Sequence, residues 1–115
     1  MEPEKIASIL LLEFPEFSKS ADLKEGPYSI LGNFAIYLRD GITDNTIRND
    51  ELDRAFYFLN EIGSSENNRE TQNQFVVGVL EILADTEESV NVMKQRLKGQ
   101  ALELFERVLA GWNNA

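Results

Sequence analysis

The sequence contains no cysteine and no histidine. Without cysteine, disulfide frameworks, thiolate zinc sites and cysteine nucleophiles are excluded. Without histidine, the chain lacks the commonest general base, the commonest metal ligand and the usual pH switch near neutrality. There is also no glycine-rich phosphate-binding loop, and the serines have no histidine to activate them. We therefore predict that the protein is not an enzyme and has no catalytic residue, no metal ion and no cofactor.

Positive charge is scarce as well. The chain has 11 lysines and arginines against 20 aspartates and glutamates, which gives a formal net charge of −9 at pH 7. This charge repels phosphate backbones, so we predict no nucleic-acid binding. A basic protein partner would instead be attracted and steered toward the chain. The alternative is that the acidity serves solubility alone.

Long apolar runs are also missing. No stretch approaches the length that crosses a membrane. The first residues, MEPEKIASILLLEF, place acids before a short apolar run, and no small-residue cleavage site follows. The sequence therefore predicts no membrane association, no signal peptide and a cytoplasmic location.

Helical periodicity is the main positive signal. The chain has 115 residues, 43% of them hydrophobic, which is the size of one domain with its own core. Each apolar stripe must face another, so we predict an all-α fold, a single compact domain over residues 1–115 of five or six mostly antiparallel helices. Apolar residues recur at helical spacing in the segments 6–12, 30–38, 52–62, 75–83, 90–97 and 101–112.

Helix boundaries are predicted from proline, glycine and capping residues. Residues 18–27 are polar and predict a connector. Valines at 76, 77 and 79 make a strand the competing prediction for that segment, although the helical offsets favour a helix. The predicted ends are Phe14-Pro15, Gly41, Gly63 and Gly99, and the predicted N-terminal caps are Asn49, Asn67 with Glu70, and Thr86.

Three consecutive aromatic residues, Phe56, Tyr57 and Phe58, lie within the predicted helix 52–62. At about 100° per residue, Phe56 falls within the apolar arc and Phe58 at its edge. Tyr57 points away from that arc, among polar residues. Tyrosine on such a face is typical of protein–protein interfaces, although a single exposed tyrosine is also common.

Carboxylates are the only abundant reactive groups in the sequence, so we compare their spacing with that of a metal-binding loop. The stretch from Asp40 to Glu51 has the length of a calcium-binding loop and an acid at each end. Ile42 lies at the third position, where an oxygen ligand is required, and Asn45 replaces the glycine of the turn. The stretch is therefore not predicted to bind calcium.

Two clusters of acidic residues are instead candidates for partner binding, and solvated helix ends are the alternative explanation for both. The first comprises Asp40, Asp44, Asp50, Glu51 and Asp53 and is partly offset by Arg39, Arg48 and Arg54. The second comprises Glu81, Asp85, Glu87 and Glu88. It has no basic residue between positions 70 and 93. With Tyr57 and Glu61, the predicted partner-binding residues are Asp40, Asp44, Asp53, Tyr57, Glu61, Glu81, Asp85, Glu87 and Glu88.

Four stretches together resemble a family of small acidic all-helical bacterial domains of unknown function, similar to toxin-neutralising immunity proteins. They are LLEFPEF, ELDRAFYFLNEI, FVVGVLEILAD and LKGQALELFERVLAGW. The resemblance implies a protein that occludes a basic, nuclease-like toxin domain, and it maps no catalytic residue onto this chain. A helical adaptor or regulatory module with a non-toxin partner is the alternative. A homodimer is also left open, because Leu11, Phe14 and Phe17 extend the apolar surface of the first helix.

Overall fold

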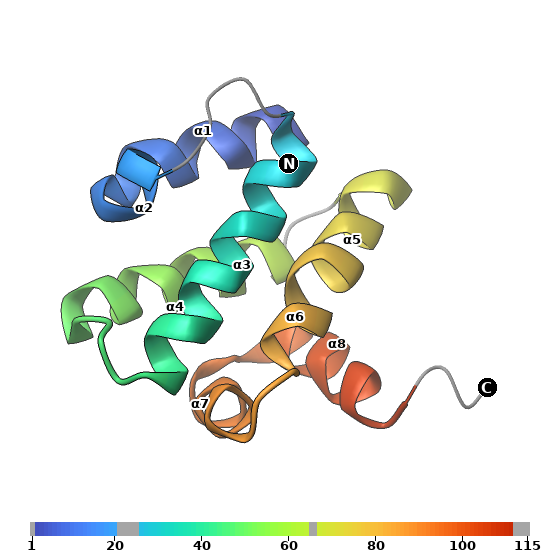
Figure 1. Cartoon of the computed structure of the whole chain (residues 1–115). Helices are drawn as coiled ribbons and strands as arrows, with labels where there is room; N and C mark the ends of the chain where they lie inside the picture. The colour runs from blue at the N-terminus through green and yellow to red at the C-terminus, as the bar shows by residue number, and fades with distance from the viewer. Residues whose placement is uncertain (1, 21–25, 65–66, 112–115) are drawn as a thin grey trace.

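The computed structural model describes residues 2–20, 26–64 and 67–111, and within them the chain is helical without a strand, as predicted. The segments α5, η1 and α6 are continuous, so the described residues form seven helices where the sequence predicts five or six. None of these helices is long and apolar enough to cross a membrane. The elements are α1 (Pro3–Glu13), α2 (Pro15–Ser20), α3 (Pro27–Thr43), α4 (Asn49–Ser64), α5 (Arg69–Phe75), the π-helical turn η1 (Val76–Leu80), α6 (Glu81–Leu83), α7 (Glu87–Arg96) and α8 (Gly99–Leu109) (Figure 1).

All three prolines of the chain begin a helix, at Pro3, Pro15 and Pro27. Proline suits this position because the first helical N–H has no partner within the helix. The predicted end of the first helix at Phe14 is confirmed, because α1 ends at Glu13. The physical reason is that proline disfavours the helical conformation in the residue before it. The predicted connector over 18–27 is wrong at its start, because α2 continues to Ser20. Residues 21–25 lie outside the described part of the chain.

Two glycines predicted to end helices serve packing instead. Helix α3 continues through Gly41 to Thr43, and α4 includes Gly63. A Cβ atom on Gly41 would lie 3.0 Å from the Cβ of Ile47, and one on Gly63 would lie 2.5 Å from the Cβ of Ala101. The contact at Gly41 would be tight, whereas Gly63 needs a residue without a side chain and brings α4 and α8 into close contact.

The remaining boundary predictions are confirmed or shifted by one residue. Gly99, the first residue of α8, has a φ of +57°, so the chain changes direction there after the end of α7, as expected of a helix-breaking glycine. Thr86 caps α7 by accepting a hydrogen bond from the N–H of Ser89 at 3.2 Å. The cap of α5 is Asn68, whose side chain accepts from the N–H of Thr71 at 2.7 Å, rather than Asn67. Helix α4 begins at Asn49, so the residue predicted as its cap is its first helical residue.

The segment with the three valines is helical, which confirms the favoured prediction, but its middle is a π-helical turn over Val76–Leu80. Phe75, Val79 and Leu83 are each four residues apart and all buried. A regular helix would rotate these positions by about 40° at each step. The wider π turn offsets this rotation, so all three remain buried on the side that packs against α3.

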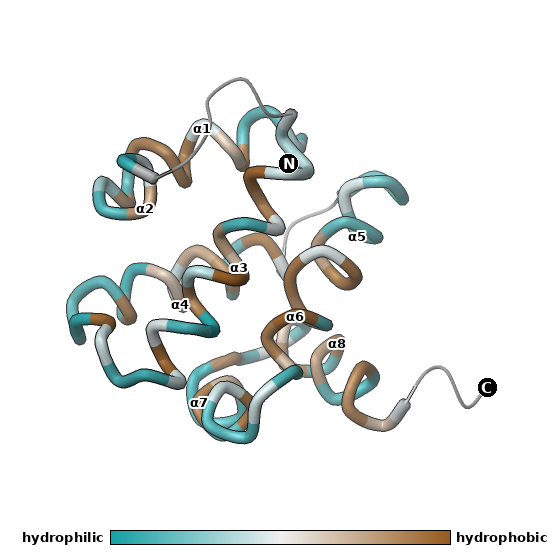
Figure 2. Tube along the Cα trace, in the orientation of Figure 1, coloured by the Kyte–Doolittle hydropathy of each residue, from teal (hydrophilic) through white to brown (hydrophobic). Residues whose placement is uncertain are grey.

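The buried apolar side chains form one cluster with aromatic rings at its centre. The ring of Phe34 on α3 lies 4.7 Å from that of Phe14 and 5.3 Å from that of Phe17, and Phe58 of α4 packs edge-on against it. Hydrophobic and hydrophilic stretches alternate along the helices, as this packing requires (Figure 2). In Figure 1, α1 lies beside the beginning of α3, α2 follows at the far end of α1, and α7 lies beyond the end of α3.

The core differs from the predicted one at a few positions. Phe14 and Phe17 are buried rather than left over for self-association, because α2 folds back against α1 and α3. Leu12, predicted to face the core, is 77% exposed, and Leu109 is also exposed. Phe58, predicted at the edge, is buried. Trp112, predicted from its helical spacing to pack against the core, lies outside the described residues.

Candidate functional site

Helix α4 presents Tyr57 to solvent, with 73% of its surface exposed. The opposite face of the helix is buried, so the orientation predicted from the periodicity is confirmed. Asp53 and Glu61 lie one turn before and one turn after Tyr57, and both are exposed. We call these three residues the α4 ridge.

The α4 ridge separates two hollows on the surface, and its three residues line both. The first, the α1–α4 groove, has a volume of about 560 Å³ and is completed by Lys5, Ile9, Glu13, Phe14, Arg54 and Phe58. The second, the α4–α7 groove, has a volume of about 670 Å³ and is completed by Phe56, Asn60, Ser64, Gln95, Arg96 and Lys98.

The α1–α4 groove has an aromatic floor. The rings of Phe14 and Phe58 lie 6.5 Å apart in an edge-on arrangement. The guanidinium carbon of Arg54 lies 5.8 Å above the centre of the Phe14 ring, which is within cation–π distance. The same guanidinium is 3.9 Å from a carboxylate oxygen of Asp50. Apolar and charged contacts are therefore both available in this groove.

Most residues that line the α4–α7 groove are polar, and several of them bind one another. Arg96 of α7 donates to Asp53 at 2.6 Å and lies 5.7 Å from the centre of the Phe56 ring. Asn60 of α4 donates to the carbonyl of Arg96 at 3.3 Å and accepts from the N–H of Lys98 at 2.8 Å. These bonds fix the connection between α7 and α8 against α4.

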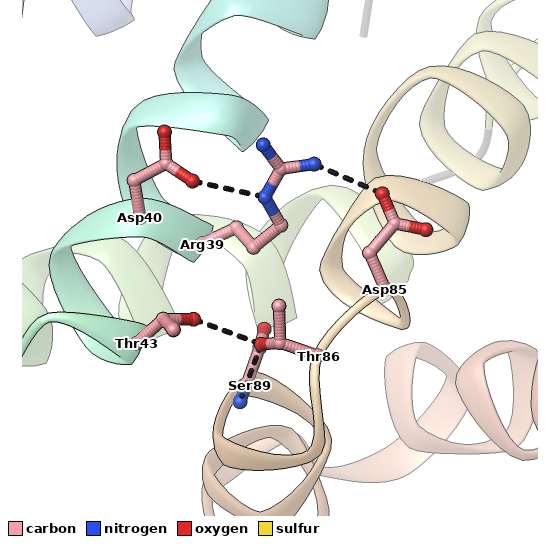
Figure 3. A network of polar contacts seen from close by, with 6 residues as sticks. All are labelled: Arg39, Asp40, Thr43, Asp85, Thr86 and Ser89. Atoms are coloured by element: carbon pink, nitrogen blue, oxygen red, sulfur yellow. Dashed lines mark hydrogen bonds and ion pairs between the residues drawn. The ribbon is translucent and has the colours of Figure 1, made fainter.

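One member of the second acidic cluster, Asp85, pairs with a base from a distant part of the chain. Arg39 of α3 lies between Asp40, at 3.1 Å, and Asp85, at 2.9 Å (Figure 3). The hydrogen bond to Asp40 is the main cause that raises the pKa of Arg39, and the bond to Asp85 adds to it. No basic residue lies between positions 70 and 93 of the sequence, and the base that compensates Asp85 comes from α3 instead.

A second contact joins the same two elements. The hydroxyl groups of Thr43 and Thr86 are 2.9 Å apart, so the cap of α7 is also bonded to the end of α3 (Figure 3). We call Arg39, Asp40, Thr43, Asp85 and Thr86 the Arg39 junction. It ties the end of α3 to the turn between α6 and α7.

The other predicted site residues are dispersed. Asp44 is exposed and lines a hollow of about 250 Å³ at the end of α3. Glu81 is half-buried on α6, and Glu87 and Glu88 are exposed in the first turn of α7. The structure thus brings Asp53, Tyr57 and Glu61 together on the α4 ridge, and it brings Asp40 and Asp85 together through Arg39.

One member of the first acidic cluster is buried. Glu51 is only 3% exposed and accepts a hydrogen bond from the hydroxyl of Tyr37 at 2.6 Å. Burial of Tyr37, followed by this bond, raises the pKa of its hydroxyl well above the usual value. A similar bond from Tyr28 to Glu70 raises the pKa of Tyr28 to about 12. Glu51 therefore belongs to the interior rather than to an acidic surface.

The described part of the chain contains no assembled metal-binding site. No three carboxylates there come together in a group that could hold an ion.

The residues that complete the two grooves are missing from the predicted site. The apolar spacing around Ile9 predicts that this side chain faces inward, but it does not predict a groove. No sequence pattern predicts the place of Arg96 and Lys98, because nothing in the local sequence shows that the end of α7 lies beside α4. Their roles depend on how the helices pack.

The comparisons with known proteins give one match. A family model described as "Domain of unknown function (DUF7674)" matches residues 7–113. No curated protein and no solved structure matches the chain. The match agrees with the predicted resemblance to small domains of unknown function, and the similarity to immunity proteins stays a prediction.

Proposed function

We propose that this chain, which belongs to the DUF7674 family, is a protein-binding protein that neutralises a basic, nuclease-like bacterial toxin domain by covering its active surface. The observation that carries the binding role is Tyr57, exposed on the α4 ridge between two carboxylates and two hollows. The toxin as partner is taken from the resemblance of the sequence to immunity proteins.

The α4 ridge has the composition of a contact surface. Tyrosine supplies a large rigid area with a polar tip and is enriched among the residues that dominate binding energy. Hollows on both sides of Tyr57 offer space for side chains of the partner. The helix that carries it is held from the inside by the close approach of Gly63 to Ala101. Contact residues on such a fixed element keep their geometry.

The net charge of −9 favours a basic partner. Toxins that act on nucleic acids carry cationic surfaces for their substrates, so an acidic protein is attracted to the surface that it must block. Electrostatic attraction raises association rates by one or more orders of magnitude and weakens as salt is added. Occlusion needs no nucleophile or general base, which accords with a chain that has neither cysteine nor histidine.

The first experiment is affinity capture with the tagged full chain from a lysate of the source cell. We expect a basic protein whose activity the purified chain suppresses at a one-to-one ratio. Tyr57→Ala should lose this capture, whereas Val77→Ala, which alters another exposed apolar side chain on η1, should retain it. Equal capture by both variants would remove the α4 ridge from the proposal.

The alternative partner class is tested separately. A captured basic protein without toxic activity, encoded away from this gene, would support an adaptor or regulatory module instead. A toxin gene immediately upstream would support neutralisation.

A further inference from the structure

We propose that α7 is a strap that opens from the body of the protein as one unit, between hinges at residues 84–86 and 97–99, while α3, α4 and α8 stay folded. Opening takes Arg96 away from the ring of Phe56 and from Asp53, so it uncovers the side of the α4 ridge that faces the α4–α7 groove. The inference goes beyond the proposed function, because it concerns a motion of the chain without any partner.

Helix α7 buries few apolar side chains. Its apolar residues are Val90, Val92 and Met93, of which Met93 is fully buried and the two valines are half-buried. Helix α4, by comparison, buries apolar side chains along its whole length. An element with few buried apolar contacts opens at a lower free energy than the one at which the whole molecule unfolds. The composition of α7 therefore favours local opening.

The inward face of α7 also carries a polar group that gains nothing from closure. Ser89 is fully buried, and its hydroxyl group has no hydrogen-bond partner in the part of the chain that the structure describes. A buried hydroxyl group without a partner costs free energy that contact with water recovers. Ser89 therefore lowers the free energy needed to open α7.

Polar contacts instead hold the two ends of α7. At its start, the Arg39 junction binds Asp85 and Thr86 to α3 (Figure 3). At its end, Arg96 pairs with Asp53 of α4 at 2.6 Å. The side chains of Asp85 and Asp53 are 57% and 69% exposed, so water replaces their ion pairs at small cost. We call these two sets of contacts the clamps of α7.

The chain on each side of α7 is built to act as a hinge. Residues 84–86 form the turn after α6, and Leu97 and Lys98 are extended before the positive φ of Gly99. Short segments at the ends of an element absorb the dihedral changes of a rigid-body motion. Leu83 and Leu97 are both buried, so they anchor the chain at the two hinges while the helix between them leaves.

The first test is amide hydrogen exchange of the unmodified full chain, followed residue by residue by NMR. We expect the amides of residues 91–96 to share one opening equilibrium and, after correction for intrinsic rates, to exchange about 100-fold faster than those of α4. Equal protection of α7 and α4 would overturn the proposal, because α7 would then open only when the whole chain unfolds. Fast exchange confined to the last turn of α7 would indicate fraying and would also overturn it.

Variants show which contacts persist in the open form. Ile6→Val removes a buried methylene group from α1, which stays packed when α7 opens, so it should speed the exchange of α4 about threefold to tenfold and leave residues 91–96 unchanged. Arg96→Gln and Thr86→Ala each remove a clamp and should speed the exchange of residues 91–96 about two- to fivefold. An acceleration of residues 91–96 by Ile6→Val as large as that of α4 would overturn the proposal.

A charge-matched control accompanies Arg96→Gln. Arg107→Gln removes the same charge from an exposed position on α8 and should leave residues 91–96 unchanged. An equal acceleration by both variants would show that net charge, rather than the clamp, sets the rate, and would contradict the role of Arg96.

The absence of cysteine from the chain allows an independent measurement. Met93→Cys and Ala55→Cys each place a single thiol at a fully buried position, the first on α7 and the second on α4. We expect dithionitrobenzoate to label the thiol on α7 about 100-fold faster, after each rate is corrected for the unfolding free energy of its own variant, measured by urea denaturation. Equal corrected rates would overturn the proposal.

Discussion

The α4 ridge and the Arg39 junction are both rich in carboxylates, but the acids have different neighbours. At the junction, Asp40 and Asp85 share Arg39, and the whole group joins α3 to the turn before α7. At the ridge, Asp53 pairs with Arg96, and an exposed tyrosine stands beside it between two hollows. The comparison teaches that a run of acids in the sequence does not by itself indicate a binding surface. We expect the junction to act in stability and the ridge in recognition.

The largest effect is expected from a change in the packing beneath the α4 ridge, where Gly63 meets Ala101. Gly63→Ala should lower the free energy of unfolding by about 3 kcal/mol, because the new Cβ would lie 2.5 Å from the Cβ and 2.8 Å from the Cα of Ala101. Urea denaturation measures this change. Gly32→Ala is the matched control. Its Cβ would meet only the carbonyl of Gly78 at 4.0 Å, so it should gain about 0.5–1 kcal/mol of helix stability.

Removal of the ridge side chain itself should separate binding from stability. Tyr57→Ala should weaken partner binding by about 2 kcal/mol, roughly 30-fold in Kd, as is typical of an interface hot spot. Its unfolding free energy should change by less than about 0.5 kcal/mol, because the side chain is exposed. Calorimetric titration with the captured partner and urea denaturation give the two values. A loss of stability as large as the loss of binding would show that the ridge is structural.

The junction should give the opposite result. Thr86→Ala removes the cap of α7 and the partner of Thr43, so the unfolding free energy should fall by about 1 kcal/mol with unchanged partner affinity. Thr46→Ala, at an exposed threonine, serves as the control. Weaker partner binding by Thr86→Ala would assign the junction a direct part in recognition.

The smallest expected effect belongs to the ion pair of the junction. Asp85→Asn should lower the unfolding free energy by about 0.5 kcal/mol at low salt, because the carboxylate is exposed, and the difference should vanish in about 1 M salt. Thermal denaturation at the two salt concentrations measures it, with Glu103→Gln on α8 as an exposed control. A difference that survives high salt would show that Arg39 and Asp85 are held by more than their charges.

Helical periodicity predicts what depends on one helix alone. The exposure of Tyr57 and the cap at Thr86 follow from positions within a few residues, so the sequence suffices for both. The role of a glycine is ambiguous in the same sequence. Gly99 adopts a positive φ, whereas Gly63 is needed because it has no side chain to collide with Ala101. Only the packed structure separates these two uses.

Contacts between distant segments are the part that the sequence does not predict. Arg39 and Asp85 are 46 residues apart, and no local pattern relates them. The two grooves likewise exist only because α1 and the end of α7 lie on either side of α4. The assignment of Phe14 and Phe17 to a surplus apolar surface is wrong for the same reason, since the sequence does not show that α2 turns back onto α3.

The close approach of Gly63 to Ala101 has a consequence for the entropy of binding. With so little space between α4 and α8, the backbone amides of α4 should be among the slowest of the chain to exchange with deuterium, even though Tyr57 on its outer face is in solvent. A preorganised helix loses little conformational freedom when a partner arrives. The free and bound forms of α4 should then superimpose, so that recognition resembles rigid-body docking.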